Sequence, residues 1–325
     1  MSEKVFLVTG AAGFIGQRTA AQLLARGNKV VGVDNLNDYY DVRLKEYRRD
    51  ELLKSENFTF RQLDIEHAAS VYALFEEFDF EVVFNLAARA GVRYSMENPH
   101  VYLSTNAEGT LNLLEGMRRS DVKKIVLAST SSLYAGQEMP FTEDLPVNTP
   151  LSPYAASKKA AEVMAYSYHH LYGMDVSVVR YFTVFGPCGR PDMSIYRFIK
   201  WIDEGKPIEL FGDGSQSRDF TYVEDVAAGT IAAAKEVGYE IINIGGGRNP
   251  ISLNTLIGWI EEALGKKAEF NYKPFHCADM TETWADISKA EKLLDWSPKM
   301  DVRDGLQKCV DWYLANKSWL KDIPV

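Results

Sequence analysis

The sequence has few cysteines, no long apolar run and no cluster of basic residues. Its three cysteines, Cys188, Cys277 and Cys309, are scattered. Their spacing fits neither a zinc site nor a disulfide framework, which favours a reducing compartment and no metal. Because no segment has the apolar length of a signal peptide or a membrane helix, we expect a soluble, cytoplasmic protein without a membrane partner. The net charge is −9, with 36 Lys and Arg against 45 Asp and Glu. Without a basic patch to follow phosphates, no nucleic acid is expected as a partner.

The rest of the composition is that of an ordinary globular protein. Of the 325 residues, 46% are hydrophobic and 25% are charged. A chain of this length and composition buries a sizeable core, which excludes intrinsic disorder and a small disulfide-stabilised module. It predicts one large α/β domain or two smaller domains.

The first 180 residues alternate short apolar runs with longer stretches of helical spacing. This alternation predicts a doubly wound parallel sheet with helices on both faces. The expected strands are Val5–Thr9, Val30–Asp34, Phe58–Asp64, Val82–Ala87, Lys124–Ser129 and Val176–Arg180, and the expected helices are Phe14–Ala25, Ala68–Phe78, Pro99–Met117 and Tyr154–Tyr172.

After residue 180 the pattern becomes irregular and predicts a smaller mixed α/β lobe over residues 181–325. Segments near 220–245 are expected to return to the first domain, residues 1–180, and the cleft between the two parts is the expected ligand site. The expected elements are the helices Ile195–Glu204, Val226–Val237, Leu253–Leu264, Ile287–Leu294 and Val302–Ala315, and the strands Ile208–Phe211 and Ile241–Ile244.

A glycine-rich turn follows the first expected strand. Gly10, Gly13 and Gly16 lie between that strand and the next helix, where glycine lets backbone N–H groups approach a pyrophosphate at the helix N-terminus. The second strand ends in Asp34. A carboxylate there binds ribose hydroxyls and repels a 2′-phosphate, which favours NAD over NADP.

A tyrosine and a lysine one helical turn apart supply a candidate acid–base pair. Tyr154 and Lys158 share one face of an expected helix. A free phenol has a pKa near 10, but a neighbouring ammonium and a cationic nicotinamide favour the phenolate. The hydroxyl cluster Ser129–Ser132 ends the fifth expected strand, where open α/β sheets bind their ligands.

These motifs together resemble the extended short-chain dehydrogenase/reductase superfamily, a Rossmann-type fold. The Gly-x-x-Gly-x-x-Gly spacing, Asp64-Ile65, Asn85–Ala88 and Asn106 carry the resemblance. It singles out Thr130 as the hydrogen-bonding partner of the reacting hydroxyl, beside Tyr154 and Lys158. Ala135 stands where relatives usually have glycine. The resemblance implies these NAD-binding residues: Gly10, Gly13, Phe14, Ile15, Gly16, Asp34, Asn35, Asp64, Ile65, Leu86, Ala87, Ala88, Asn106, Tyr154, Lys158, Tyr181 and Val184.

The residues after Thr130 bear on the reaction. Dehydratases of the superfamily have an Asp-Glu pair there, and UDP-glucuronate decarboxylases have Glu two residues after the threonine. Here the positions hold Ser131 and Ser132, which favours epimerisation. The segments 33–41, 88–95 and 181–193 resemble the UDP-glucuronate 4-epimerases, which interconvert UDP-glucuronate and UDP-galacturonate through a 4-keto intermediate and bound NAD. A decarboxylase, or a 4-epimerase of neutral UDP-sugars, stays open as the alternative.

The same resemblance implies the substrate-binding residues and the assembly. Ser131, Ser132 and Thr183 would hold the hexuronate carboxylate as neutral donors, and Arg190 would help to close the lobes. The remaining implied contacts are Arg93, Phe211 at the uracil, Arg218 at the diphosphate and Asp279 at the uridine ribose. The helices Pro99–Met117 and Tyr154–Tyr172 resemble the pair that forms a four-helix bundle in a homodimer.

Overall fold

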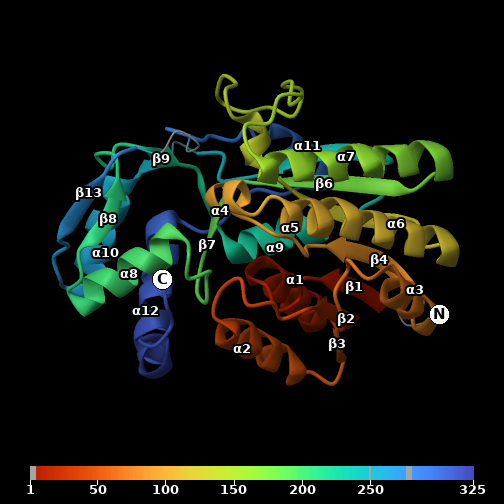
Figure 1. Ribbon diagram of the computed structural model, residues 1–325, viewed down its shortest axis with the longest axis horizontal. Helices are drawn as coiled ribbons and strands as arrows, with labels where there is room; N and C mark the ends of the chain where they lie inside the picture. Colours follow the sequence, from red (N-terminus) through yellow and green to blue (C-terminus); the bar gives the residue numbers. More distant parts are fainter. Residues whose placement is uncertain (1–4, 249, 276–279) are drawn as a thin grey trace.

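A seven-stranded parallel sheet forms the centre of the molecule (Figure 1). The computed structural model describes residues 5–248, 250–275 and 280–325, so that Cys277 and Asp279 lie outside the described residues. The strand order is β11-β6-β5-β4-β1-β2-β3. The strands are β1 (Val5–Thr9), β2 (Lys29–Asp34), β3 (Phe58–Gln62), β4 (Phe80–Asn85), β5 (Lys124–Thr130), β6 (Asp175–Tyr181) and β11 (Tyr239–Ile244).

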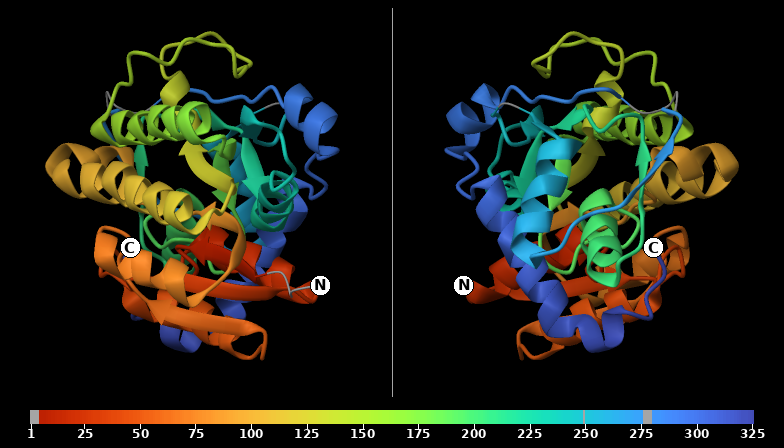
Figure 2. Two further views of the ribbon diagram at one scale, coloured as in Figure 1. Left: turned by 90° about the vertical axis from the view of Figure 1, so that its right-hand side faces the viewer. Right: turned by 90° about the vertical axis from the view of Figure 1, so that its left-hand side faces the viewer.

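Alternate side chains of each strand enter two separate cores. Phe6 and Val8 pack with α1 (Phe14–Ala25), α9 (Val223–Ala232) and α11 (Ser288–Leu294). Leu7, between them, packs with α3 (Ala68–Glu77), α6 (Gly109–Ser120) and α7 (Pro153–Tyr172) on the opposite face. Figure 2 shows these two helical layers from both ends of the sheet. The doubly wound, Rossmann-type fold is therefore confirmed.

The second lobe lies beside one end of this sheet and has its own apolar core. Its helices are α8 (Ser194–Glu204), α10 (Leu253–Leu264) and α12 (Val302–Leu320). Beside them lies a parallel pair, β8 (Ile208–Phe211) and β13 (Phe270–Lys273), of which β8 contributes Ile208 and Leu210 to the core. Two short pairs, β7 (Thr183–Phe185) with β10 (Phe220–Tyr222) and β9 (Ser217–Arg218) with β12 (Ile251–Ser252), connect this lobe to the sheet.

Some elements differ from the sequence expectation. The expected helix Pro99–Met117 is interrupted: α5 (His100–Leu103) is followed by a π-helical turn at Ser104–Glu108 and then by α6. The expected helix Val226–Val237 begins and ends earlier, as α9. Two helices were not expected, α2 (Val42–Leu53) and α4 (Val92–Glu97). The inner face of α2 includes the buried polar residues Lys45 and Arg48, so the apolar periodicity that predicts a helix is weak there.

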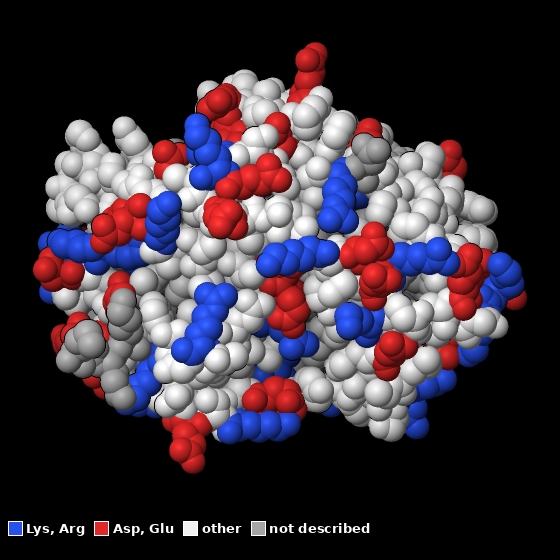
Figure 3. All heavy atoms as spheres, turned by 180° about the vertical axis from the view of Figure 1, so that it is seen from behind, with Lys and Arg blue, Asp and Glu red and all other residues white. Residues whose placement is uncertain are grey.

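Charges of both signs are interspersed over the face drawn in Figure 3. Among the residues that the structure describes, no helix is long and apolar enough to span a bilayer. The segment between β5 and α7, residues 135–152, projects above α7 (Figures 1 and 2).

Candidate active site

A cavity of about 770 Å³ opens at the carboxyl ends of the parallel strands, and second-lobe residues complete its wall. Nearly all of the residues predicted from the sequence line it. They are Gly10, Gly13, Phe14, Ile15, Gly16, Asp34, Asn35, Asp64, Ile65, Leu86, Ala87, Ala88, Arg93, Thr130, Ser131, Ser132, Tyr154, Lys158, Tyr181, Thr183, Val184, Arg190, Phe211 and Arg218. Two predicted residues are not among them: Asn106 lies behind the wall, and Asp279 is outside the described residues.

The glycine turn forms one end of the cavity. Gly10 has a φ of +68°, and a Cβ there would lie 2.8 Å from the backbone nitrogen of Ala87. A Cβ at Gly16 would lie 2.0 Å from the carbonyl oxygen of Gly10. Only glycine permits this approach of the turn to β4 and to its own helix. The first turn of α1, whose N–H groups have no partner within the helix, therefore lines the cavity.

Asp34 lies below the glycine turn at the end of β2. Its Oδ2 accepts a hydrogen bond from the backbone N–H of Ala12 at 3.1 Å, and its Oδ1 accepts one from Leu36 at 2.9 Å. The neighbouring Asn35 side chain donates to Asp64 Oδ2 at 2.7 Å. These contacts fix two carboxylates at the ends of β2 and β3, where both line the cavity.

Tyr154, Lys158 and Thr130 meet in the middle of the cavity wall. Burial raises the pKa of Tyr154 above its ordinary value of 10.0, while a hydrogen bond with Thr130 and the positive charge of Arg190 lower it. The Lys158 Nζ donates to the carbonyl oxygen of Ala128 at 2.9 Å. Burial also lowers the pKa of Lys158 to about 8, and the charge of Glu162 opposes this change. Tyr154 and Lys158 therefore titrate in an environment with little water, where neighbouring charges act strongly.

Asn106 reaches the site indirectly, through the π-helical turn that carries it. Its side chain exchanges two hydrogen bonds with the backbone of Arg89, at 2.9 and 3.0 Å, and donates to the Ser157 hydroxyl at 2.9 Å. Ser157 in turn donates to the carbonyl oxygen of Tyr154 at 2.7 Å. Asn106 thus connects the loop after β4 with the first turn of α7.

The cationic side chains on the second-lobe side have protein partners. Arg190 forms a bidentate ion pair with Asp192, through Nε at 3.0 Å and Nη2 at 2.5 Å, and also donates to the carbonyl oxygen of Ala90. Arg93 of α4 lies over the Phe211 ring at 3.9 Å and so connects the two lobes across the cavity. Arg218 donates to the carbonyl oxygens of Ser217 and Thr281.

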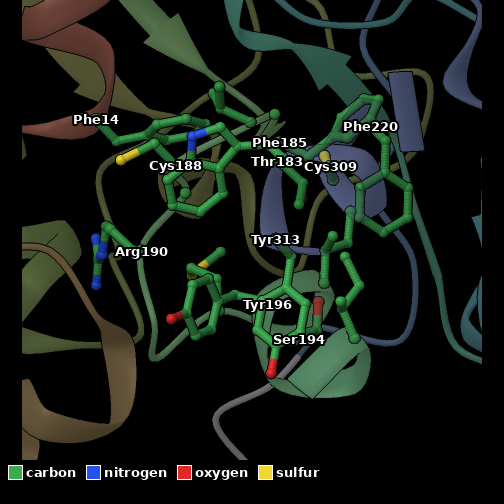
Figure 4. A pocket seen from close by; sticks show the side chains of 17 residues that line it. Phe14, Thr183, Phe185, Cys188, Arg190, Ser194, Tyr196, Phe220, Cys309 and Tyr313 are labelled. Carbon is green, nitrogen blue, oxygen red and sulfur yellow. The ribbon is translucent and has the colours of Figure 1, made fainter. Parts of the chain in front are cut away.

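A second, much smaller cavity of about 30 Å³ lies behind the segment 183–196. Figure 4 shows Phe14 of the glycine turn, Cys188 of the loop, and Cys309 and Tyr313 of α12 around it. The guanidinium of Arg190 points away from this space, consistent with its contacts to Asp192 and Ala90. This packing supports β7, which carries Thr183, and the loop after it, which carries Arg190.

The structure also places residues at the large cavity that sequence reasoning missed. Lys45 donates to the carbonyl oxygen of Asn37 at 2.7 Å, and Arg89 donates to the Asn37 Oδ1 at 3.0 Å. Tyr102 lies behind the cavity wall and packs edge-on against the ring of Tyr154, with ring centroids 5.9 Å apart. Arg89 lies in a segment with family resemblance, which could have drawn attention to it, whereas the placement of Lys45 depends on the unexpected helix α2.

Comparisons with known proteins agree with this geometry. A UDP-glucuronate 4-epimerase of Thermodesulfobacterium geofontis is 61% identical over 320 residues, which are 98% of this chain and 99% of that protein. A crystal structure of the Bacillus cereus UDP-glucuronic acid 4-epimerase, in complex with UDP-glucuronic acid and NAD, superposes with a TM-score of 0.90 at 37% identity. The match covers 96% of this chain and 99% of that one.

A UDP-glucose 4-epimerase of Thermotoga maritima has the same fold, with a TM-score of 0.87 at 31% identity over 96% of this chain and 99% of that one. The family model that matches residues 6–245 is described as the NAD dependent epimerase/dehydratase family. That match spans the sheet, the glycine turn and the Tyr154–Lys158 pair, and the chain therefore belongs to the NAD dependent epimerase/dehydratase family.

Proposed function

We propose that this protein epimerises C4 of UDP-glucuronate, reversibly, to give UDP-galacturonate. The observation that carries the proposal is the cavity itself. One wall combines the acid–base pair Tyr154 and Lys158 with Thr130 and with the neutral donors Ser131 and Ser132. The high identity to a UDP-glucuronate 4-epimerase over nearly the whole chain supports the same conclusion.

The residues present at the glycine turn fit NAD. A Cβ at Gly10 or Gly16 would collide with the backbone of Ala87 or of Gly10, so glycine keeps the tight turn that presents backbone N–H groups to a pyrophosphate. Asp34 supplies a carboxylate acceptor for the hydroxyl groups of the adenine ribose, and Asp64 supplies a carboxylate at the proposed position of the adenine ring. When bound, NAD supplies the acceptor and donor of the C4 hydride.

The chain's own groups handle the proton. Tyr154 takes the proton of the C4 hydroxyl, and Thr130, within hydrogen-bonding reach of the same phenol, orients that hydroxyl. Lys158 stabilises the phenolate by its charge. After the 4-keto sugar has turned its other face to the site, Tyr154 returns the proton to the new C4 hydroxyl.

The polar groups near the proposed carboxylate position favour epimerisation over loss of CO₂. Ser131, Ser132 and Thr183 can donate hydrogen bonds without adding charge. The guanidinium of Arg190 is already paired with Asp192 through Nε and Nη2. Loss of CO₂ would move the negative charge from the carboxylate to the 4-keto oxygen. Hydrogen bonds from these donors stabilise the charge on the carboxylate itself, and so oppose that loss.

We also propose that residues 1–180, with the later segments near 220–245, bind the dinucleotide, whereas residues 181–325 mainly bind the UDP-sugar. Phe211 would pack on the uracil, Arg218 would contact the diphosphate, and Asp279 would contact the ribose. Arginine suits a bidentate phosphate contact. A cytoplasmic location is supported by the buried free thiols of Cys188 and Cys309.

A homodimer is supported by apolar side chains on adjacent helices that the single chain leaves exposed. Leu103 at the end of α5 is 58% exposed, and Val163 and Tyr166 on α7 are 52% and 53% exposed. The spacing of Val163 and Tyr166 places both on one side of α7. A second copy of this chain, packed through the same two helices, would cover them as in the bundle that the sequence resemblance implies.

The decisive experiment follows UDP-glucuronate by NMR with the purified protein. We expect UDP-galacturonate to appear while the total UDP-hexuronate stays constant. The Tyr154→Phe variant, which removes the proton acceptor, should lower kcat by about 10²–10⁴-fold. Formation of a UDP-pentose with release of CO₂ would instead establish the decarboxylase, and turnover of UDP-glucose alone would establish the neutral-sugar epimerase.

A further inference from the structure

Three residues on one face of α7 contact three consecutive residues at the end of β5. Tyr154, Lys158 and Glu162 follow one another at intervals of one helical turn. Tyr154 pairs with Thr130, Lys158 donates to the carbonyl oxygen of Ala128, and Glu162 accepts from the Ser129 hydroxyl at 2.7 Å. The proposed mechanism uses the first two of these pairs. The third pair joins the same helix to the same strand and has no assigned role.

Glu162 is completely buried, and its carboxylate contacts the side chains of Ser129, Arg180 and Lys159. Its side chain has a relative exposure of 0%. Besides the Ser129 hydroxyl, Oε1 accepts from Arg180 Nε at 2.9 Å, and Oε2 accepts from Arg180 Nη2 at 2.8 Å. Lys159 Nζ lies 3.3 Å from Oε2. A carboxylate held in this way has one position and remains ionised, since these donors lower its pKa against the effect of burial.

The contacts of Arg180 extend this arrangement across the sheet. Its Nη1 donates to the Tyr134 hydroxyl at 2.8 Å, and Tyr134 donates to Asn243 Oδ1 at 2.8 Å. Glu162 therefore joins α7 to β5 through Ser129 and to β6 and β11 through Arg180. The position of the catalytic helix along the strands depends on this buried network.

The charge of Glu162 also acts on Lys158. The ionisable groups around the pair are Tyr154 and Lys159 on α7, Arg180 on β6, Tyr134 after β5, Glu143 of the projecting segment and Tyr239 on β11. Desolvation disfavours the protonated form of Lys158, and the negative charge of Glu162 favours it. Arg180 and Lys159 are cations, and Tyr134 and Tyr239 are phenols whose pKa values burial raises above the ordinary value of 10.0, so both are neutral near neutral pH.

We propose that Glu162 is a positioning residue for the reaction: it keeps Lys158 charged beside Tyr154 and holds α7 in register with the end of β5. Ser129 and Arg180 fix its carboxylate for this purpose. The proposal rests on the proposed function only for its kinetic consequence, because the charge state of Lys158 can be measured without substrate.

The test uses Glu162→Gln, which keeps the size of the side chain and removes its charge. The intact protein is labelled with ¹³Cε-lysine, and the Lys158 signal is assigned as the one that is lost in Lys158→Met. In Glu162→Gln, this signal should titrate at least about one pH unit lower than in the wild type. The alkaline limb of the kcat profile should move in the same direction. At a pH above the Lys158 pKa of both the wild type and Glu162→Gln, the variant contains about tenfold less charged Lys158. Its kcat should therefore be about tenfold lower than that of the wild type.

The matched control is Asp175→Asn at the opposite end of β6. Asp175 pairs with the buried Lys124 and accepts two backbone N–H groups, so its loss should lower stability. It should leave the Lys158 titration and the shape of the pH profile unchanged. Equal effects of the two variants would show that Glu162 is merely structural and would overturn the proposal, as would an unshifted Lys158 titration in Glu162→Gln.

Two further variants keep the proposal testable if Glu162→Gln does not fold. Glu162→Asp keeps the charge and should restore the alkaline limb, even with a lower kcat. Ser129→Ala keeps the charge but removes one of the bonds that fix it, and should lower kcat with little change in KM. An unchanged kcat in Ser129→Ala would contradict the positioning role. If the wild type forms no epimer, the proposed function fails, while the NMR titration still decides the role of Glu162.

Discussion

At the scale of single residues, the site separates charge from hydrogen bonding. The groups beside the proposed carboxylate position, Ser131, Ser132 and Thr183, are neutral donors, whereas the cation Lys158 lies one helical turn from the reacting phenol on the same face of α7. This division suits a reaction in which the C4 hydroxyl must lose and regain a proton while the neighbouring carboxylate stays attached. The two predictions that follow test each half of the division.

Thr183 tests the neutral donors. The Thr183→Val variant keeps the shape of the side chain and removes its hydroxyl, so one hydrogen bond to the substrate carboxylate should be lost. Because such a bond contributes about 1.5–3 kcal/mol when one partner is charged, we expect kcat/KM for UDP-glucuronate to fall by roughly 10–100-fold. Steady-state kinetics check this. An unchanged kcat/KM would remove Thr183 from the carboxylate site, and Thr281→Val, outside the cavity lining, serves as the control.

Lys158 tests the charged half. Burial lowers the pKa of Lys158 to about 8, so the ammonium loses its proton as the pH rises through that value. Since the charge supports the Tyr154 phenolate, kcat should decline above about pH 8. In Lys158→Met, which never carries the charge, kcat should be at least about 100-fold lower at neutral pH. Its residual activity should rise with pH across the range in which the wild type declines, because Tyr154 must then lose its proton unaided. A parallel pH profile for the two proteins would contradict this role.

At the scale of elements, α2 couples the cofactor turn to the second lobe. Its residue Arg48, 1% exposed, donates to the carbonyl oxygens of Cys188 at 2.7 Å, Gly189 at 3.1 Å and Ala12 at 3.3 Å. On the same helix, Tyr47 stacks on Trp319 of α12. A helix with a polar inner face thus holds the glycine turn and the loop that carries Arg190 in one arrangement.

Replacing Arg48 should therefore weaken the fold and cofactor binding together. Arg48→Met leaves buried carbonyl oxygens without their donors, and we expect the free energy of unfolding to fall by at least about 3 kcal/mol. Urea unfolding and NAD affinity measure the two effects. The control is Arg49→Met on the same helix, where Arg49 forms a surface pair with Asp50, worth about 0–1 kcal/mol. Equal losses in both variants would contradict the role of Arg48.

The same helix shows what sequence reasoning could and could not predict. The buried strands were predictable because both faces are covered by helices, which makes runs such as residues 5–8 continuously apolar. The acid–base pair was predictable because helical spacing and strand ends are local properties. Helix α2 was missed because two of its four buried residues are Lys45 and Arg48. Strand β13 was missed because its side chains are largely exposed and its pairing partner β8 is distant in the sequence.

The π-helical turn and Glu162 were hidden for a related reason. An extra residue in a helix leaves no periodic signal that a short window can detect, although it aims Asn106 at Arg89 and Ser157. In the sequence alone, Glu162 is one more charged residue of an expected helix. Its contacts with Ser129 and Arg180 arise only when β5 and β6 are placed beside α7.

At the scale of the whole molecule, the charge of the cavity differs in sign from that of the protein. The chain has a net charge of −9. Among the described residues that line the large cavity, seven carry Lys or Arg side chains and four carry Asp or Glu side chains. The proposed ligands, NAD and a UDP-hexuronate, are both anionic. Salt screens the acidic groups that lie far from the cavity more than it screens the cations that line it. The positive cavity therefore attracts these ligands at close range, although the protein as a whole is acidic.

The proposed homodimer is the second property of the whole molecule that can be tested. If α5 and α7 pack against a second copy, the wild type should elute with twice the chain mass of 36.6 kDa. The double substitution Val163→Glu and Tyr166→Glu would place two carboxylates in that interface, and burying unpaired charges is costly. We expect this variant to elute near the mass of one chain, with unchanged far-UV circular dichroism.

The control is Tyr272→Glu in the second lobe, where an equally large side chain is 63% exposed. Light scattering coupled to gel filtration measures the masses. A dimer that survives the double substitution but dissociates in the Tyr272→Glu protein would place the interface on β13 instead of on α5 and α7.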